Sequence, residues 1–205
     1  MDKILIFGDS IAQGYWDDEF GGWAERLKIF CMKNDEDVTV HNHGYSGDTS
    51  EELLKRLEFE RKNGRLEDKD VAIIFAIGMN DSGFIHSEDS LQVNQEKFKK
   101  NIDKIIQSVK KLQIKYFFVG INNVIDSITD PVPWHLDISY KNENIKKYNK
   151  IIKLICEENN INFIDIFNLL NRSDFYNDDG VHPNPKGHQK IFEIVKESLI
   201  KNKII

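Results

Sequence analysis

The chain has 205 residues, enough for one large domain or two small ones, and its 40% hydrophobic content, with 13 Phe and 3 Trp, excludes wholesale disorder. Because 34 acidic side chains outnumber 28 basic ones, the formal net charge is -6, and the overall basic surface typical of nucleic-acid-binding proteins is absent. We therefore expect one folded domain over residues 1–205 that binds no nucleic acid.

Five short apolar segments alternate with longer segments of helical periodicity. They are rich in β-branched residues and show little polar alternation, which predicts strands covered on both faces. The predicted strands occupy residues 3–7, 37–41, 71–77, 116–121 and 161–166. Between and after them, apolar residues recur at spacings of three and four, which indicates helices. This alternation predicts an α/β domain with a parallel sheet between two layers of helices.

Two helix starts carry specific signals. Thr49 is followed three residues later by Glu52, the pattern of a capping box, in which each residue bonds the backbone of the other. Pro185 is expected to open the last helix, because its fixed φ angle suits the first turn. Both signals place a helix directly after a loop that follows a predicted strand.

Polar residues follow the predicted strands at the edge where such a fold binds its ligands. Ser10 follows the first strand, Gly47 the second and Asn80 the third, whereas Asp179 and His182 come after the fifth. Each alone has an ordinary explanation as a helix cap, a turn residue or a surface side chain. Together they supply the nucleophile, base, orienting group and oxyanion donors that hydrolysis of an acyl bond requires.

Four sequence blocks resemble those of the GDSL, or SGNH, family of serine esterases and lipases. They read IFGDSI at 6–11, NHGYSGDT at 42–49, GMND at 78–81 and DGVHP at 179–183, in the family's order. The resemblance implies a flavodoxin-like three-layer α/β/α sandwich with a five-stranded parallel sheet. It also implies hydrolysis through an acyl-serine intermediate, with no cofactor and no metal.

The resemblance assigns three catalytic roles. Ser10 corresponds to the nucleophile, His182 to the general base that later acts as general acid, and Asp179 to the residue that orients the imidazole. Asp9 and Asp81 are expected to brace the loops by hydrogen bonding rather than to touch substrate.

The resemblance also implies an oxyanion hole. Its donors correspond to the backbone N–H groups of Ser10 and Gly47 and the side-chain amide of Asn80. Gly44 is the other candidate in the second block, and Gly47 is preferred because the run SGD gives the closer match.

The segment after the fourth predicted strand departs from the family pattern. It reads NNVI where many relatives carry proline, and at about 18 residues, 122–139, it is long for a strand-to-helix connection. Whether it acts as a lid stays open. Trp134, with Val132 and Leu136, either lines the acyl or alcohol pocket or packs within a rigid surface loop.

Tyr15 and Trp16 follow the predicted nucleophile, and two interpretations stay open for them. They either wall a substrate pocket or lie buried under the first helix. The five remaining histidines form no pair at zinc-ligand spacing, so no metal site is predicted; they are His41, His43, His86, His135 and His188.

The two cysteines, Cys31 and Cys156, lie far apart without metal-ligand spacing, which favours buried thiols in a reducing compartment. The longest apolar run, 71–77, is too short to span a bilayer. The amino-terminal residues lead straight into a short strand rather than into the apolar stretch of a signal peptide. We therefore expect a cytoplasmic protein without stable membrane association.

The acidic residues near the first block bear on the charge of the substrate. The loop after the first strand carries Asp9, Asp17, Asp18 and Glu19, with no basic residue before Arg26, which disfavours phosphate and other anions. The sequence thus predicts hydrolysis of a small, neutral carboxylic ester with a short acyl chain. A carbohydrate O-acetyl ester, a thioester or a lysophospholipid is the alternative substrate. The alternative outside enzymes is a flavodoxin-like ligand-binding module, and the oligomeric state stays open.

Overall fold

A five-stranded parallel sheet forms the centre of the protein, seen here in a computed structural model that describes residues 2–34, 37–64, 66 and 70–205. The strands are β1 (Lys3–Gly8), β2 (Thr39–Gly44), β3 (Val71–Ala76), β6 (Lys115–Val119) and β8 (Asn162–Ile164). Their order is β2-β1-β3-β6-β8, and every neighbouring pair is parallel. The chain moves outward from β1 to β2 and then returns to β3, so the loops after β1 and β3 diverge at a switch point.

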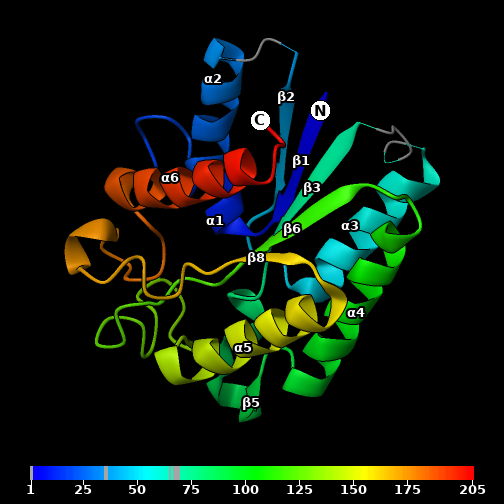
Figure 1. Cartoon of the computed structure of the whole chain (residues 1–205). Helices are drawn as coiled ribbons and strands as arrows, with labels where there is room; N and C mark the ends of the chain where they lie inside the picture. Colours follow the sequence, from blue (N-terminus) through cyan, green and yellow to red (C-terminus); the bar gives the residue numbers. More distant parts are fainter. Residues whose placement is uncertain (1, 35–36, 65, 67–69) are drawn as a thin grey trace.

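Helices cover both faces of this sheet. In Figure 1, α2 and α6 lie on one face and α3, α4 and α5 on the other, which confirms the predicted three-layer α/β/α sandwich. Their bounds are Trp23–Asn34 for α2, Ser50–Lys62 for α3, Gln95–Lys110 for α4, Asn142–Asn159 for α5 and Pro185–Lys201 for α6. The capping box of Thr49 and Glu52 is present at the start of α3, and Pro185 opens α6 behind the Asn184 cap.

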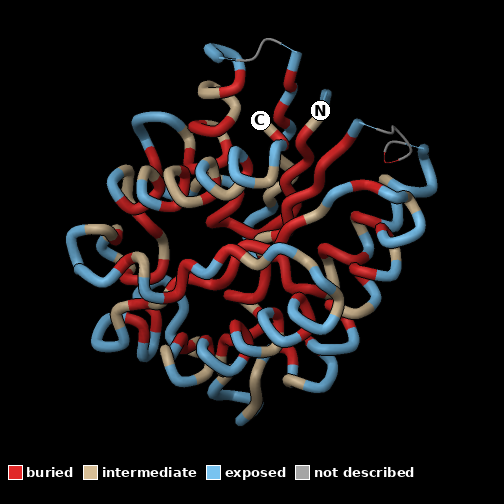
Figure 2. The backbone as a smooth tube through the Cα atoms, viewed as in Figure 1, coloured by how far each residue is buried: buried red, intermediate tan, exposed pale blue. Residues whose placement is uncertain are grey.

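The core lies between the sheet and its two helical layers. Figure 2 shows buried residues along the strands and exposed ones on the outer helix faces. Central strands β1 and β3 are almost wholly apolar, and Ile4, Ile6, Phe7 and Phe75 have no exposed surface. Burying each such side chain stabilises the fold by about 1.5–3 kcal/mol. This packing fixes the carboxyl ends of the strands, from which the loops of the site begin.

Strand β2 lies further along the chain than the predicted strand at residues 37–41. Its pairing with β1 continues through polar residues to the register Gly8↔Gly44. As the edge strand, β2 has one open side, so His43 and its neighbours can pair through the backbone while their side chains stay partly exposed. The loop of the second block therefore begins at Tyr45 rather than at Asn42.

A second, three-stranded antiparallel sheet was not predicted. Its strands β4 (Phe84–Ile85), β5 (Ser90–Leu91) and β7 (Ile138–Ser139) have two residues each, too short for hydrophobic periodicity to reveal. Strand β7 lies in the long segment after β6, so this sheet ties that segment to the loop that follows β3. Within the described parts of the chain, no helix is both long and apolar enough to cross a bilayer.

Candidate active site

Ser10 lies at the carboxyl end of β1, where it is the first residue of the short helix α1 (Ser10–Gln13) and is buried. Asp9 rather than Ser10 caps this helix, since its Oδ1 accepts a hydrogen bond of 3.0 Å from the N–H of Ile11. Gly8 is required just before, because a Cβ there would lie 2.4 Å from the carbonyl oxygen of Ala76. This close approach of β1 to β3 sets the hydroxyl of Ser10 at the switch point.

The structure brings Ser10, His182 and Asp179 into one hydrogen-bonded chain. The Oγ of Ser10 lies 2.9 Å from Nε2 of His182, and Nδ1 of the same ring lies 2.7 Å from Oδ2 of Asp179. A carboxylate only accepts hydrogen bonds, so Nδ1 carries the proton and Nε2 is left to accept from the serine hydroxyl. The arrangement can therefore take the proton of Ser10 onto His182.

Asp179 is fixed by more than the imidazole. Its Oδ1 accepts backbone N–H groups of Val181 at 2.9 Å and His182 at 2.8 Å. Burial acts to raise the pKa of Asp179, but the bonds and positive charge from His182, with these two N–H groups, hold it below its usual range. The carboxylate thus stays ionised and can stabilise an imidazolium at His182.

Asn80 and Gly47 lie in the loops after β3 and β2. Asn80 opens the 3₁₀ turn η1 (Asn80–Ser82), and its Nδ2 donates to the carbonyl oxygen of Asp48 at 2.8 Å. Gly47 has a φ of +84°, a conformation that favours glycine. The hydrogen bond to Asp48 ties Asn80 to the residue next to Gly47.

Gly44, the other candidate of the second block, makes contacts that support the fold. Its N–H donates to Oδ1 of Asn42 at 2.9 Å. A Cβ at this position would lie 2.3 Å from the backbone nitrogen of Gln13, so Gly44 allows α1 to pack against β2. These contacts favour Gly47 as the donor from the second block.

Two buried carboxyl groups brace the loops, as expected for Asp9 and Asp81. Burial raises the pKa of Asp9 to about 6 and that of Asp81 to about 7. Asp81 accepts hydrogen bonds from both the N–H and the hydroxyl of Ser50, and the same hydroxyl accepts from Asn101. The loop after β3 is thereby bonded to the start of α3 and to α4.

Arg56 is a supporting residue that no sequence pattern indicated. From α3 its guanidinium reaches Oδ2 of Asp48 at 2.6 Å and the carbonyl oxygens of His43 at 2.8 Å and Gly8 at 3.2 Å. It joins the ends of β1 and β2 to the loop of Gly47. A single arginine on an amphipathic helix looks like an ordinary surface residue, so only the structure identifies this contact.

Tyr15 and Trp134 lie beside the imidazole of His182, and Trp16 contacts Asp179. The rings of Tyr15 and Trp134 have centroids 6.0 Å and 5.6 Å from that of His182. Tyr15, Trp16 and Trp134 are exposed by 36%, 53% and 50%, so neither Tyr15 nor Trp16 is buried under the first helix. The Nε1–H of Trp16 donates to Oδ2 of Asp179 at 3.2 Å, a contact that the sequence did not predict.

The other two candidates of the long segment are placed differently. Val132 has no exposed surface and packs in the core, so its interpretation as a pocket residue is wrong. Leu136 is 77% exposed. Its segment folds back on itself through the bridge between Val132 and His135, which buries the valine and turns Leu136 outward.

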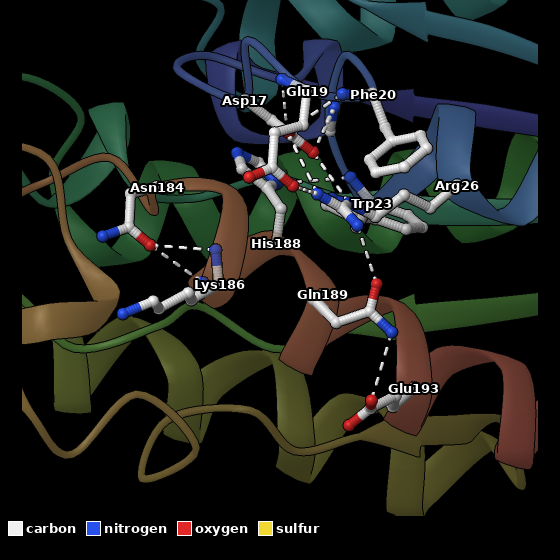
Figure 3. A network of polar contacts seen from close by, with 12 residues as sticks. Asp17, Glu19, Phe20, Trp23, Arg26, Asn184, Lys186, His188, Gln189 and Glu193 are labelled. Carbon is white, nitrogen blue, oxygen red and sulfur yellow. Dashed lines mark hydrogen bonds and ion pairs between the residues drawn. The ribbon is translucent and has the colours of Figure 1, made fainter.

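A polar network holds the loop of Tyr15 and Trp16 in place (Figure 3). His188 is buried; its Nε2–H donates to the carbonyl oxygen of Tyr15 at 2.8 Å, and Nδ1 accepts from the N–H of Trp23 at 3.2 Å. Burial lowers the pKa of His188 to about 4, so the ring is neutral. Asp17 binds Arg26 at 2.7 Å and accepts three loop N–H groups, which fixes the segment between α1 and α2.

A cavity of about 490 Å³ adjoins this loop. Tyr15, Trp16 and Asp18 line one side, and Asn177 and Asn184 lie among its other lining residues. Among the residues that the structure describes, no group of three or more His, Cys, Asp or Glu side chains is placed to hold a metal ion.

Comparison with known proteins gives the same assignment as the motifs. A family model described as GDSL-like lipase/acylhydrolase matches residues 6–190. The chain belongs to the GDSL-like lipase/acylhydrolase family. It is accordingly a hydrolase of ester bonds, and the four blocks that carry the matching motifs all lie within the matched range.

Named relatives of this acylhydrolase are esterases. An arylesterase of Vibrio mimicus is 25% identical over 207 residues, covering 98% of this chain and 90% of that protein. A human isoamyl acetate-hydrolyzing esterase 1 homolog is 24% identical over 205 residues, covering 93% of this chain and 78% of that one. The crystal structure of a lipase/acylhydrolase from Enterococcus faecalis has a TM-score of 0.77 at 23% identity, covering 98% of this chain and 97% of the other, and supports the fold.

Replacing Trp16 distinguishes its indole N–H from its ring surface. In Trp16→Phe we expect kcat to fall about three- to tenfold with KM unchanged, because the ring remains but the hydrogen bond to Asp179 is lost. Trp16→Ala is expected to raise KM as well, since the aromatic surface is then removed. Steady-state kinetics on one ester would measure kcat and KM of both variants. A Trp16→Phe variant with wild-type kcat would mean that Trp16 contributes to activity only through its ring and not through its N–H.

Proposed function

We propose that this acylhydrolase cleaves small, neutral carboxylic esters with short acyl chains through an acyl-Ser10 intermediate. The observation that carries the proposal is the unbroken chain of hydrogen bonds from Ser10 through His182 to Asp179. It supplies a nucleophile, a base and an orienting carboxylate in the geometry that acyl transfer requires.

In the first step, Oγ of Ser10 attacks the carbonyl carbon of the ester while its proton passes to Nε2 of His182. The carbonyl π electrons move to the oxygen, which becomes an oxyanion facing Asn80 and the N–H groups of Ser10 and Gly47. The tetrahedral species then collapses: the C–O bond to the alcohol breaks, and the alkoxide takes the proton from His182. Acyl-Ser10 and free alcohol are the products.

In the second step, water repeats this attack on acyl-Ser10. His182 takes a proton from the water, a second oxyanion forms, and the bond from the acyl carbon to Oγ breaks. Ser10 recovers its proton from His182 and the carboxylic acid leaves. Throughout, Asp179 remains ionised beside the imidazole, consistent with a pKa held below the usual range.

Charge and shape around the site support a small, neutral substrate. Acidic Asp18 lines the adjacent cavity, whereas the charges of Asp17 and Glu19 are paired with Arg26, so an anionic leaving group would approach the like charge of Asp18. The exposed rings of Tyr15 and Trp134 flank His182 and offer apolar surface for a short acyl or alcohol group. Of the relatives above, one is named an arylesterase and the other a homolog of an esterase that hydrolyses isoamyl acetate, which is a neutral ester with a short acyl chain.

Hydrolysis of p-nitrophenyl acetate, butyrate and octanoate tests this proposal, with acetyl-CoA and butyryl-CoA as anionic comparators. We expect the highest kcat/KM on acetate or butyrate. Fastest turnover of octanoate would contradict the short acyl chain, and faster turnover of the CoA thioesters would contradict the argument from charge. No turnover of any ester by the purified protein would contradict the esterase assignment itself.

Asn80→Ala is expected to lower kcat about 100- to 1000-fold, because the oxyanion loses its side-chain donor at the moment when negative charge develops. KM is expected to change far less, since the neutral carbonyl of the bound ester depends less on that donor. Steady-state kinetics on p-nitrophenyl acetate would measure both constants. An unchanged kcat would exclude Asn80 from the oxyanion hole.

A further inference from the structure

Tyr140 is a buried residue next to Asn80 that belongs to none of the four sequence blocks. It directly follows β7, and the pairing Phe84↔Ser139 between β4 and β7 brings it beside the turn that Asn80 opens. Its ring packs closely over the turn, because a Cβ at Gly83 would lie 3.1 Å from Cε1 of Tyr140. The long segment after β6 thus contributes a side chain directly to the surroundings of Asn80.

The hydroxyl of Tyr140 lies 3.0 Å from Oδ1 of Asn80. The direction of this bond follows from the partner on the other side of the amide. The carbonyl oxygen of Asp48 can only accept, so the atom facing it at 2.8 Å is Nδ2, and Oδ1 faces Tyr140. Tyr140 is therefore the donor, and burial, which raises the pKa of its phenol, keeps that donor protonated.

These two hydrogen bonds use Oδ1 and one N–H of the Asn80 amide, and its second N–H takes part in neither. Since an amide has two N–H donors, the carbonyl of Asp48 takes one and the other is directed elsewhere. If Oδ1 exchanged places with Nδ2, it would face the carbonyl oxygen of Asp48, where two acceptors cannot form a hydrogen bond. A hydrogen bond to the amide oxygen also polarises the group and makes its N–H a stronger donor.

Tyr140 is itself held on both sides. Its N–H donates to the carbonyl oxygen of Thr129 at 2.9 Å, and the hydroxyl of Thr129 donates back to the carbonyl oxygen of Tyr140 at 2.6 Å. One residue earlier, the hydroxyl of Ser139 donates to Asp130 at 2.6 Å and contacts Nε2 of His86 at 2.7 Å. Ser139 is fully buried, so this second Ser-His-Asp group fixes β7 rather than offering a nucleophile.

We propose that Tyr140 is a positioning residue of the oxyanion hole, which orients and polarises the amide of Asn80 through its hydroxyl. The inference rests on the proposed function, since it concerns the oxyanion formed on the acyl-serine pathway. It gives the long segment 122–139 and the small second sheet a part in catalysis: they hold in place the residue that sets the direction of a catalytic donor.

Tyr140→Phe tests this role, because it keeps the ring and removes only the hydroxyl. We expect kcat on p-nitrophenyl acetate to fall about three- to tenfold with KM within about twofold, the effect of losing one neutral hydrogen bond. Affinity for a boronic acid, whose adduct with Ser10 places an oxygen at the oxyanion position, is expected to fall by a similar factor. Thermal unfolding would verify that the variant is folded.

Tyr148→Phe is the matched control. Tyr148 is likewise buried, but its hydroxyl donates to the carbonyl oxygen of Val93 and not to Asn80. This variant is expected to lose some stability and to keep wild-type kcat. A general effect of removing a buried hydroxyl would instead lower kcat in both variants, and would overturn the role of Tyr140.

A double variant separates positioning from a structural effect. If Tyr140 acts through Asn80, adding Tyr140→Phe to Asn80→Ala is expected to leave kcat unchanged, because the amide that it orients is already absent. The same three- to tenfold loss in that background, or wild-type kcat in Tyr140→Phe alone, would overturn the proposal. Failure of the proposed function would look different: the wild-type protein would show no turnover that depends on Ser10. The Tyr140 variants cannot produce that result, because they are compared with an active wild type.

Discussion

Replacing Ser10 with alanine is expected to lower kcat on p-nitrophenyl acetate by roughly four to six orders of magnitude, because the variant lacks the hydroxyl that lies 2.9 Å from Nε2 of His182. The variant is expected to fold like the wild type, since Asp9 rather than Ser10 caps α1. Burst kinetics and mass spectrometry of quenched wild type would in turn detect the acyl group on Ser10.

Ser108→Ala is a suitable control for this experiment. The hydroxyl of Ser108 bonds the carbonyl oxygen of Lys104 within α4, so the variant is expected to keep wild-type turnover. Activity that survives in Ser10→Ala would point to a contaminating hydrolase or to hydrolysis by a base alone, and would reject Ser10 as the nucleophile.

Replacing Asp179 with asparagine is expected to lower kcat by roughly 10⁴-fold, and the structure supplies a specific reason. Oδ1 of Asp179 accepts two backbone N–H groups, so an asparagine would place its oxygen there and its NH₂ group at the position of Oδ2. That NH₂ group would face Nδ1 of His182 and the N–H of Trp16. His182 would then protonate at Nε2 instead, and could not accept the proton of Ser10.

Asp174→Asn is the matched control, because Asp174 is a nearby acidic residue whose ion pair with Arg172 at 2.9 Å lies away from the imidazole. It is expected to retain wild-type kcat. Measuring kcat for both variants at pH 7, with circular dichroism to verify folding, completes the comparison. An Asp179→Asn variant within tenfold of wild type would mean that His182 is oriented by other contacts.

Much of this site could be predicted from the sequence because it depends on regular structure. Runs such as 71–77 indicate buried parallel strands, and the ends of such strands meet at one edge, which brings Ser10, Asn80 and His182 together. The spacing of Asp179 from His182 keeps both within one loop, so their contact needs no long-range information. Periodicity and connectivity predict where these loops lie, whereas the roles expected of the residues in them come from the resemblance of the four blocks to the GDSL family.

The supporting contacts could not be predicted in the same way. Tyr140 reaches Asn80 because two strands of two residues pair across the chain, and Arg56 reaches the ends of two strands and one loop from what looks like an ordinary helix face. Trp16 was expected either to wall a pocket or to be buried; it lines the cavity beside its loop, and the further contact of its N–H with Asp179 was not predicted. Each contact depends on the direction of a long side chain in the finished fold, which local sequence does not determine.

The contact between Ser10 and His182 joins residues separated by 172 positions in the chain. During synthesis the strand that precedes the proposed nucleophile therefore leaves the ribosome long before the proposed base, and domains fold from their amino-terminal part onward. Ser10 remains without its base until the loop of His182 and helix α6 have docked against α2. Esterase activity thus reports completion of the fold, and a nascent or truncated chain with an intact sheet would still be inert.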